Sequence, residues 1–312
     1  LFIFKMDIED GGELLEDIIS NKTNNKKSQK KQMVNKSKKQ NKNKTEQDND
    51  SSNKKKIFIK TFGCSHNASD SEYMMGILEK EGYEIVDNLE DSDLTIINSC
   101  TVKSPSQAAF LNSVIKSKNN NKKVVVGGCV PQAERNLKGL ENCSIVGVSQ
   151  INNIDYIVKN TLEGNTVRLL ENKTLPSLLL PKMRRNKYIE IIPISQGCLG
   201  SCTYCKTKQA RGKLISYPIK QIVEACKRAW ENNAKELWVT SEDTGVYGRD
   251  IGTNLPNLMV EILKYIPKDV MIRIGMANPP YILENVNPMI KVLNHPNVYS
   301  FIHIHNKNYS WK

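Results

Sequence analysis

The chain has 312 residues, of which 39% are apolar, and its 45 Lys and Arg outnumber 33 Asp and Glu to give a net charge of +12. No stretch approaches the roughly 20 apolar residues that span a bilayer, which excludes a membrane-spanning segment within this sequence, and the apolar start is too short for a signal peptide. We therefore expect a cytoplasmic chain of about two domains, whose 8 cysteines act as ligands or catalytic groups rather than as disulfides.

Positive charge is spread along the whole chain. Residues 1–56 contain 14 Lys against 9 acidic residues, and the remainder contains 31 basic against 24 acidic residues. This excess favours a polyanionic partner such as RNA, although a solvated Lys-rich surface explains it equally well. Residues 1–55 are predicted to be a tail that is disordered from about residue 21, because Lys, Asn, Gln and Ser there offer little apolar area to offset the entropy of ordering. Before that segment, "DIEDGGELLEDIIS" is compatible with one short amphipathic helix.

From residue 56 to residue 163, predicted strands alternate with predicted helices. The strands fall at 57–62, 94–98, 123–128 and 144–147, and the helices at 70–80, 104–117 and 151–160. This alternation predicts an α/β domain built on a doubly wound parallel sheet. The basic, Pro-containing segment 164–187 is predicted to link this domain to the next.

A second series of alternating strands and helices occupies residues 188–312. Its strands are predicted at 188–194, 236–240, 270–275 and 298–304, and its helices at 217–231, 255–266 and 281–293. Four strands of this kind predict an incomplete (βα) barrel. In such a barrel the active site lies in the loops that follow the carboxyl ends of the strands.

Three cysteines fall within the first of these loops, in the stretch "GCLGSCTYC". A zinc ion would need a fourth ligand, and no second cysteine or histidine pair lies nearby. A [4Fe-4S] cluster held by three thiolates instead leaves one iron open to a substrate, whereas the alternative is three coincidental loop thiols. The spacing C-x3-C-x2-C resembles the signature of the radical S-adenosylmethionine (SAM) enzymes. We refer to Cys198, Cys202 and Cys205 as the second cysteine trio.

A first cysteine trio is formed by Cys64, Cys100 and Cys129, each of which follows a predicted strand of the amino-terminal domain. The carboxyl ends of parallel strands meet at one edge of a sheet, so these thiols are expected to converge there as ligands of a second cluster. Any one of them alone would more often be a small buried residue. Cys143 and Cys226 are expected to be core residues.

Six stretches closely resemble the tRNA methylthiotransferases, in particular the eukaryotic and archaeal branch that acts on N6-threonylcarbamoyladenosine. They read "KTFGCSHNASDSEYM", "INSCTVKSPS", "VVVGGCVPQAER", "GCLGSCTYCKTKQARGKLISYP", "VTSEDTGVYGRDIGTNLP" and "IRIGMANPPYIL". The resemblance implies an enzyme that adds a methylthio group to C2 of that nucleoside at position 37, next to the anticodon. It also implies two [4Fe-4S] clusters, one on each trio, SAM as cofactor, and tRNA and an external electron donor as partners.

The same resemblance suggests further contacts. Glu242, after the second barrel strand, is a candidate for the amino group of SAM, and Arg273, on the third strand, for its carboxylate. A plain salt bridge or a solvated charge is an equal alternative for each. The basic run that follows the second trio is placed to meet RNA phosphate, and it consists of Lys206, Lys208, Arg211 and Lys213.

Members of this family continue beyond the last residue of this sequence. They complete the barrel, add an RNA-binding TRAM domain and, in eukaryotes, often end in an anchor for the endoplasmic reticulum membrane. A chain truncated after about four barrel strands, without the TRAM domain, is therefore expected. Two alternatives remain: a sister enzyme that acts on isopentenyl-adenosine in tRNA, and an inactive RNA-binding remnant.

Overall fold

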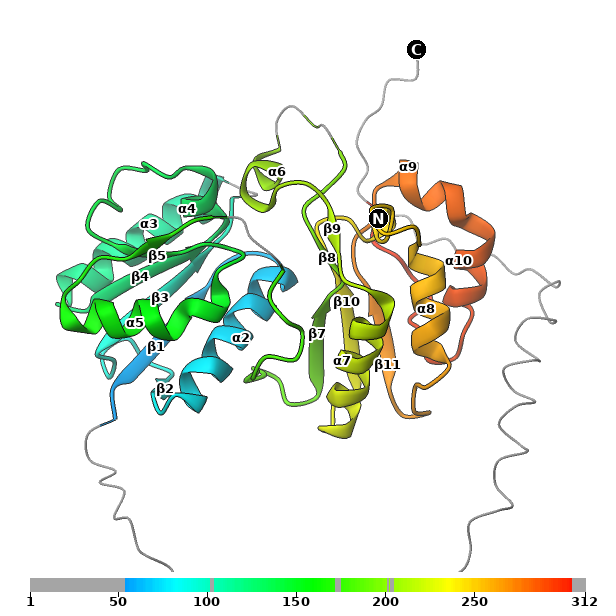
Figure 1. Ribbon diagram of the computed structural model, residues 1–312, viewed down its shortest axis with the longest axis horizontal. Coiled ribbons are helices and arrows are strands. Elements are labelled where there is room, and N and C mark those ends of the chain that lie inside the picture. The colour runs from blue at the N-terminus through cyan, green and yellow to red at the C-terminus, as the bar shows by residue number, and fades with distance from the viewer. Residues whose placement is uncertain (1–53, 102–103, 172–174, 201, 203–204, 305–312) are drawn as a thin grey trace, which may run out of the picture. The chain divides into compact units, whose positions relative to one another are not determined.

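The computed structural model describes residues 54–101, 104–171, 175–200, 202 and 205–304 (Figure 1). The predicted tail lies outside this part, apart from its last two residues. The described residues belong to one compact unit that begins at Lys54. No helix in this part of the chain combines the length and the apolar character needed to cross a membrane.

The amino-terminal part of the described chain forms a six-stranded sheet in which all neighbouring strands are parallel. The strand order is β2-β1-β3-β4-β5-β6 (Figure 1). The strands are β1 Lys56–Thr61, β2 Glu84–Val86, β3 Leu94–Ser99, β4 Lys123–Gly128, β5 Ser144–Val146 and β6 Arg168–Leu169. A parallel sheet was expected, and this mixed α/β architecture confirms it.

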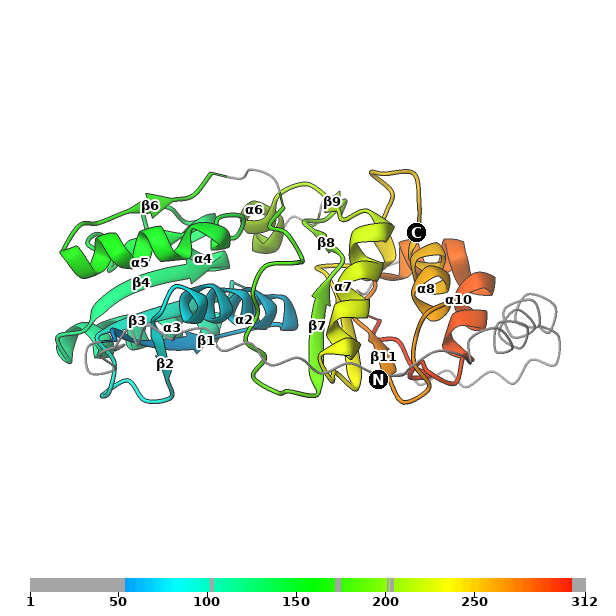
Figure 2. The same cartoon turned by 60° about the horizontal axis from the view of Figure 1, so that its bottom comes forward.

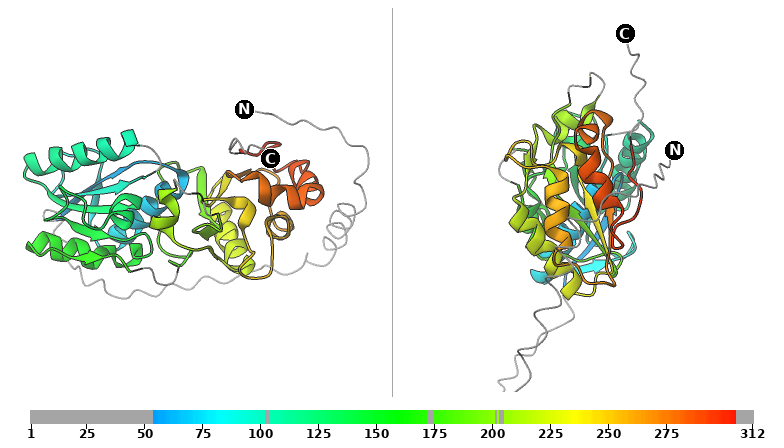
Figure 3. Two further views of the ribbon diagram at one scale, coloured as in Figure 1. Left: turned by 90° about the horizontal axis from the view of Figure 1, so that it is seen from above. Right: turned by 90° about the vertical axis from the view of Figure 1, so that its right-hand side faces the viewer.

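Helices cover both faces of this sheet. Alternate side chains of a strand point to opposite faces, so Ile96 and Val125 pack on one side with α2 and α5, whereas Ile97 and Val126 pack on the other with α3. This burial on both faces explains why the central strands read as continuous apolar runs. The helices are α2 Ser65–Lys80, α3 Ser104–Asn119 and α5 Ile154–Glu163, and the left panel of Figure 3 shows α3 and α5 on opposite sides.

A second parallel sheet follows, with the strand order β11-β10-β7. Leu237 and Ile272 pack against helices on one face, while Trp238 and Arg273 are cross-strand neighbours on the other. The expected core cysteines are confirmed, since Cys143 and Cys226 are fully buried in apolar clusters. The elements are β7 Ile189–Pro193, β10 Glu236–Thr240, β11 Met271–Ile274, α7 Ile219–Glu231, α8 Leu255–Leu263 and α10 Val286–Leu293.

Shorter elements complete the loops. A two-stranded antiparallel sheet, β8 with β9, closes the base of the loop that holds the second trio. The remaining elements are β8 Ser195–Gln196, β9 Ile215–Ser216, α4 Cys129–Ala133, α6 Lys206–Arg211 and α9 Pro279–Ile282, with the 3-10 helices η1 Ile151–Asn153, η2 Thr244–Val246 and η3 Leu283–Asn285.

The structure differs from the predicted elements in three places. The first helix begins at Ser65, directly after Cys64, and not near residue 70. Strands β2 and β6 were not predicted, because they are too short for a recognisable alternation. The fourth strand expected at 298–304 is wrong as a continuous strand: this segment makes only two isolated parallel bridges to the neighbouring segment, Val298 with Ile272 and Ile304 with Ala277.

The segment that joins the two sheets packs between α2 and β7 (Figure 2). Where it crosses α2, a Cβ atom built on Gly76 would lie 2.5 Å from the backbone nitrogen of Lys182. The backbone N–H of Met183 donates to the carbonyl of Glu72, and Lys182 Nζ donates to the carbonyl of Ile191 on β7. The segment therefore ties the helix of the first sheet to the free edge of the second.

Lys182 is also a cation of a buried charge cluster. Its Nζ lies 2.5 Å from Glu190 Oε1, 3.4 Å from Glu72 Oε2 and 4.7 Å from the centre of the Tyr73 ring. Burial raises the pKa of Glu72, and Lys182 opposes that rise. Lys182 thus faces two carboxylates, and Arg184 Nε lies 3.7 Å from Glu190 Oε2 as a second cation.

The close crossing at Gly76 gives a first prediction. Gly→Ala inside a helix ordinarily stabilises by up to about 1 kcal/mol, but Gly76→Ala should destabilise by about 1–3 kcal/mol, because the new methyl group overlaps backbone atoms. The measurement is the free energy of unfolding in urea. Glu79→Ala on the exposed side of α2 is the control and should change it little. A stabilised Gly76→Ala variant would show that the crossing is looser than described.

The charge cluster gives a second prediction. Lys182→Met should destabilise by about 3–5 kcal/mol at pH 8, because the buried Glu72 loses its cation, whereas Glu190 keeps Arg184. Burial already raises the pKa of Glu72 above its usual value, and the loss of Lys182 removes a group that lowers this pKa. The loss of stability should therefore shrink as the pH falls through the raised pKa of Glu72 and the carboxyl becomes protonated. Thermal unfolding of the variant and of the unchanged chain at pH 8 and pH 5 tests this, and a loss that grows towards pH 5 would contradict it.

Candidate functional site

The first cysteine trio lies at the carboxyl edge of the six-stranded sheet. Cys64 follows β1, Cys100 follows β3, and Cys129 follows β4, and these three strands are direct neighbours in the sheet. Cys100 and Cys129 are buried, whereas Cys64 is exposed. The sequence expectation that three distant thiols reach one edge therefore agrees with the strand order.

Glycines allow the loops of this trio to approach one another closely. Gly63 has a φ of +99°, and a Cβ atom at this position would lie 2.6 Å from Cys100 Sγ. Gly128, next to Cys129, has a φ of +83°. An L-residue at either position would be strained, and at Gly63 it would also displace a thiol. The Cys100 side chain, through its Cβ and Sγ atoms, thus fills the space that a side chain at position 63 would need.

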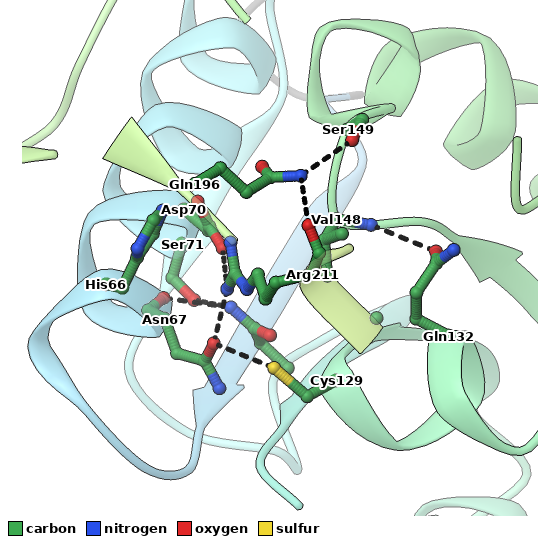
Figure 4. A network of polar contacts seen from close by, with 12 residues as sticks. His66, Asn67, Asp70, Ser71, Cys129, Gln132, Val148, Ser149, Gln196 and Arg211 are labelled. Carbon is green, nitrogen blue, oxygen red and sulfur yellow. Dashed lines mark hydrogen bonds and ion pairs between the residues drawn. The ribbon is translucent and has the colours of Figure 1, made fainter. Parts of the chain in front are cut away.

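Asn67 connects all three cysteine loops. Its Nδ2 donates to the carbonyl of Phe62 at 3.0 Å and to that of Ser99 at 2.8 Å, and these residues lie shortly before Cys64 and Cys100 in the sequence. Its Oδ1 accepts a hydrogen bond from Cys129 Sγ at 3.8 Å (Figure 4). One fully buried amide therefore fixes the spacing of the first trio.

The second trio lies in a loop whose base is narrow. Gly197 has a φ of +79°, and a Cβ atom there would lie 2.6 Å from the carbonyl carbon of Lys213 at the other side of the base. Within the loop, the backbone N–H of Gly200 points at Cys198 Sγ at 3.2 Å, and a Cβ atom on Gly200 would lie 3.4 Å from Cys198 Sγ and 3.8 Å from Cys202 Sγ. Two of the thiols therefore lie around one small backbone turn.

Within the described residues, no group of three or more His, Cys, Asp or Glu side chains converges as closely as a single metal ion requires. A [4Fe-4S] cluster makes a different demand, because each thiolate binds its own iron atom at a separate corner. Because the cysteine side chains of each trio do not converge on one point, each trio suits a [4Fe-4S] cluster better than a single zinc ion.

Arg211 links the two cysteine loops. It ends α6, which follows the second trio, and it is 2% exposed. Its Nη2 donates to Asn67 Oδ1 at 2.7 Å and to Asp70 Oδ2 at 2.6 Å on α2, as Figure 4 shows. The expectation that Arg211 meets RNA phosphate is therefore wrong, because its charge is buried among protein carboxylates. In the same run, Lys206 forms an ion pair with Glu134, and Lys213 is exposed.

Glu242 lies on the other side of the same guanidinium. Its Oε1 is 3.6 Å from Arg211 Nε and 3.0 Å from His66 Nδ1. Burial alone would raise the pKa of Glu242, but His66 and Arg211 outweigh it and hold that pKa below its usual value. Its second oxygen, Oε2, is buried and has no hydrogen-bond partner among the described residues. This oxygen is a free acceptor, so a contact with the amino group of SAM stays a prediction.

Arg273 lies on the face of the second sheet that is not covered by α7 and α8. Its guanidinium stacks 4.7 Å from the ring centre of Trp238, its neighbour on β10. The side chain is partly exposed, which suits a residue that faces the interior of an open barrel. Recognition of a cofactor carboxylate by Arg273 also stays a prediction.

The loops after β10 and β11 are held together by Asp243, which is fully buried. Its Oδ1 accepts from the backbone N–H groups of Gly245 and Asn278, each at 3.0 Å, and its Oδ2 accepts from Asn278 Nδ2 at 2.6 Å. At the junction of the two sheets, Ser65 Oγ lies 2.8 Å from Thr240 Oγ1 at the end of β10. The hydrogen bond between Ser65 and Thr240 therefore brings the carboxyl edge of the first sheet, where the first trio lies, beside the end of β10.

Desolvation favours the neutral form of three thiols, Cys64, Cys129 and Cys198. Burial raises the pKa of Cys129 to about 12, and Arg211 is the main group that opposes this rise. Desolvation also raises the pKa of Cys64 and of Cys198. Because a metal ligand is the thiolate, positive charge from bound iron or from Arg211 is needed to stabilise the charged form.

Sequence reasoning missed Asn67, Asp70 and the inward role of Arg211. The first two occupy one face of α2 in the stretch "CSHNASD", three residues apart, and both are buried polar residues next to Cys64. Polar residues at helical spacing just after a candidate ligand were the available signal. This signal could not be used because the helix was expected to begin only near residue 70, whereas it begins at Ser65.

The role of Asn67 gives a third prediction. Asn67→Ala should destabilise by at least about 2 kcal/mol, because it leaves the carbonyls of Phe62 and Ser99 buried without their donor. Urea unfolding monitored by circular dichroism measures this. Asn257→Ala, at an exposed position of α8, is the matched control and should be nearly neutral. Equal effects in the two variants would contradict the role given to Asn67.

Comparisons with known proteins agree with these features. Residues 56–147 match a family model described as "Uncharacterized protein family UPF0004". Threonylcarbamoyladenosine tRNA methylthiotransferase of Homo sapiens is 52% identical over 257 residues, which cover 80% of this chain and 44% of the relative. The probable enzyme of that name from Pyrococcus horikoshii is 36% identical over 252 residues, with 80% and 59% covered.

Two solved structures share the fold. They are the radical S-adenosylmethionine methyltransferase TsrM from Kitasatospora setae with tryptophan and a SAM analog bound, at a TM-score of 0.51, and TsrM with cobalamin and a [4Fe-4S] cluster bound, at 0.52. They are 13% and 14% identical to this chain. The matches cover 76% and 77% of this chain and 57% and 59% of the TsrM chains. At this low identity, the similarity concerns the fold alone.

The chain spans about half the length of the curated relatives that it matches, from 44% of the human relative to 59% of the archaeal one. On these matches, 80% of this chain is similar to the threonylcarbamoyladenosine tRNA methylthiotransferases, and residues 56–147 match the UPF0004 family.

Proposed function

We propose that this chain carries the two cluster-binding parts of an enzyme that adds a methylthio group to C2 of N6-threonylcarbamoyladenosine at position 37 of tRNA. The observation that carries the proposal is the pair of cysteine trios, one after the strands of each parallel sheet, with Arg211 bonded between their loops. Residues 56–163 are assigned to the methylthiotransferase domain, 164–187 to the linker, and 188–312 to part of a radical SAM barrel.

The target atom explains why two metal centres are needed. C2 of the adenine ring carries an unactivated C–H bond, which offers no acidic proton and no leaving group to a side chain. Bound clusters and SAM would supply the one-electron chemistry and the sulfur that amino acids lack. The polypeptide would contribute orientation of the base and exclusion of water and oxygen.

The residues of the first trio fit such a cluster. Three sulfur ligands leave one iron without a protein ligand. Gly63 leaves room for the Cys100 side chain to lie against the Cys64 loop, and the amide of Asn67 holds the three loops at one spacing. The open iron would then face whatever approaches the carboxyl edge of the sheet.

The second trio and its surroundings fit a cluster with SAM. The buried Oε2 of Glu242, which has no hydrogen-bond partner among the described residues, is suited to accept an ammonium group. Arg273 presents a planar guanidinium suited to a carboxylate. The two residues follow or lie on neighbouring strands, β10 and β11. An external donor in the reducing cytoplasm would supply electrons.

Cluster binding is tested by anaerobic reconstitution with iron and sulfide. The unchanged chain should hold about eight iron atoms, and the Cys64→Ala and Cys198→Ala variants should each lose about half of them, because each cluster contains four. Cys226→Ala, which removes a fully buried thiol in the core of the second sheet, is the matched control and should keep full iron content. If both trio variants retain the iron of the unchanged chain, the ligand assignment is wrong.

The substrate is tested by mass spectrometry of tRNA nucleosides. In cells that lack the gene, the methylthio derivative of N6-threonylcarbamoyladenosine should disappear while the unmodified nucleoside accumulates. Loss of the methylthio derivative of isopentenyl-adenosine instead would assign the chain to the sister activity. An unchanged nucleoside profile would contradict both assignments.

A further inference from the structure

Arg211 is a buried cation that the proposed reaction does not use. Its side chain is almost fully buried. The groups around it come from both sheets of the described chain. They are Asn67 and Asp70 on α2, Cys129 at the start of α4, and Glu242 in the loop after β10. Arg211 Nη1 is buried and has no hydrogen-bond partner among the described residues. A buried guanidinium with one unpaired nitrogen has room for an acceptor that the described residues do not provide.

The charge of Arg211 lies beside the first trio. The charge of Arg211 acts on both Cys129 and Cys64, and Asn67 Oδ1 accepts from Arg211 and from Cys129 Sγ at the same time. Sulfur ligands and the inorganic sulfides of a cluster are negatively charged acceptors. A cluster on this trio would place such acceptors beside the guanidinium.

The charge is fixed in place. Asp70 Oδ2 at 2.6 Å and Asn67 Oδ1 at 2.7 Å hold Nη2, and Glu242 Oε1 at 3.6 Å lies beside Nε. Little solvent is present to screen a charge in this position, so its effect on a neighbouring redox centre is larger than that of a surface charge. An added electron at the first trio would be stabilised by Arg211 and opposed by Glu242.

We propose that Arg211 is a positioning residue that sets the reduction potential of the cluster on the first cysteine trio, so that a residue of the second trio's loop governs how readily the first trio's cluster accepts an electron. This inference rests on the proposed function, because it requires a cluster at the first trio. The residue acts through its charge and is not itself a ligand. Hydrogen bonds to sulfur and nearby charge are the general means by which proteins tune such centres.

The experiment uses the chain with Cys198→Ala, Cys202→Ala and Cys205→Ala, in which the first trio holds the only cluster proposed. After anaerobic reconstitution, the sample is titrated with dithionite in the presence of mediators, and the electron paramagnetic resonance signal of the reduced cluster is recorded against potential. Each cluster takes up one electron, and oxidised dithionite is the other product. Iron content is measured on every sample.

Three variants in this background separate charge from structure. Arg211→Gln removes the cation and should lower the midpoint potential, reducing the ratio of reduced to oxidised cluster at a fixed potential at least tenfold, or about 59 mV for a one-electron couple. Glu242→Gln removes the opposing charge with nearly the same shape and should shift the potential in the opposite direction. Arg211→Lys keeps a positive charge and should restore most of the potential lost in Arg211→Gln.

Opposite shifts in the Gln variants, with rescue by Lys, would support the inference. Shifts of the same sign, or no shift in samples with full iron, would overturn it. If Arg211→Gln fails to fold or to bind iron, the test rests on the midpoint potential of Glu242→Gln. An upward shift of that potential supports the inference, and no shift or a downward shift overturns it. If the background chain itself binds no iron, the proposed function fails, and the inference fails with it for that distinct reason.

Discussion

The arrangement of both cysteine loops depends on the burial of one guanidinium group. A buried charge is tolerated only when its hydrogen bonds and its counter-charges are supplied nearby. Arg211 meets that condition through Asp70 and Asn67 on α2 and Glu242 after β10, which fixes α6 against the first sheet. Since α6 follows the second trio directly, this requirement also fixes where the second trio lies relative to the first.

The fold supplies the rest of the site through simple rules. Parallel strands end at one edge, so loops distant in sequence meet there. Glycines at Gly63 and Gly197 adopt a left-handed backbone and leave space that other residues would fill. The linker, held by Lys182 and pressed against Gly76, joins α2 to the outer strand of the second sheet. Rigid packing of this kind is what two redox centres need if they are to act on one atom.

Much of this could be predicted from the sequence, for identifiable reasons. The buried strands are long apolar runs, and each cysteine of the first trio directly follows one, so β1, β3, β4 and the edge they share follow from local patterns. The inward turn of Arg211 could not be predicted, because its partner Asp70 lies 141 residues away and two nearby lysines, Lys206 and Lys213, are exposed. The burial of Glu242 against His66 depends on the same long-range packing. The segment 298–304 was expected to form a continuous strand, but it makes only two isolated bridges to its neighbouring segment.

The central claim is that two clusters sit on the two trios, at adjoining edges of the two sheets. Anomalous X-ray scattering at the iron absorption edge, from crystals of the anaerobically reconstituted chain, tests this most directly. The account predicts two separate groups of iron atoms, one bounded by Cys64, Cys100 and Cys129 and the other by Cys198, Cys202 and Cys205, with the Arg211 side chain between them. A single group of iron atoms, or iron bound away from either trio, would contradict the account.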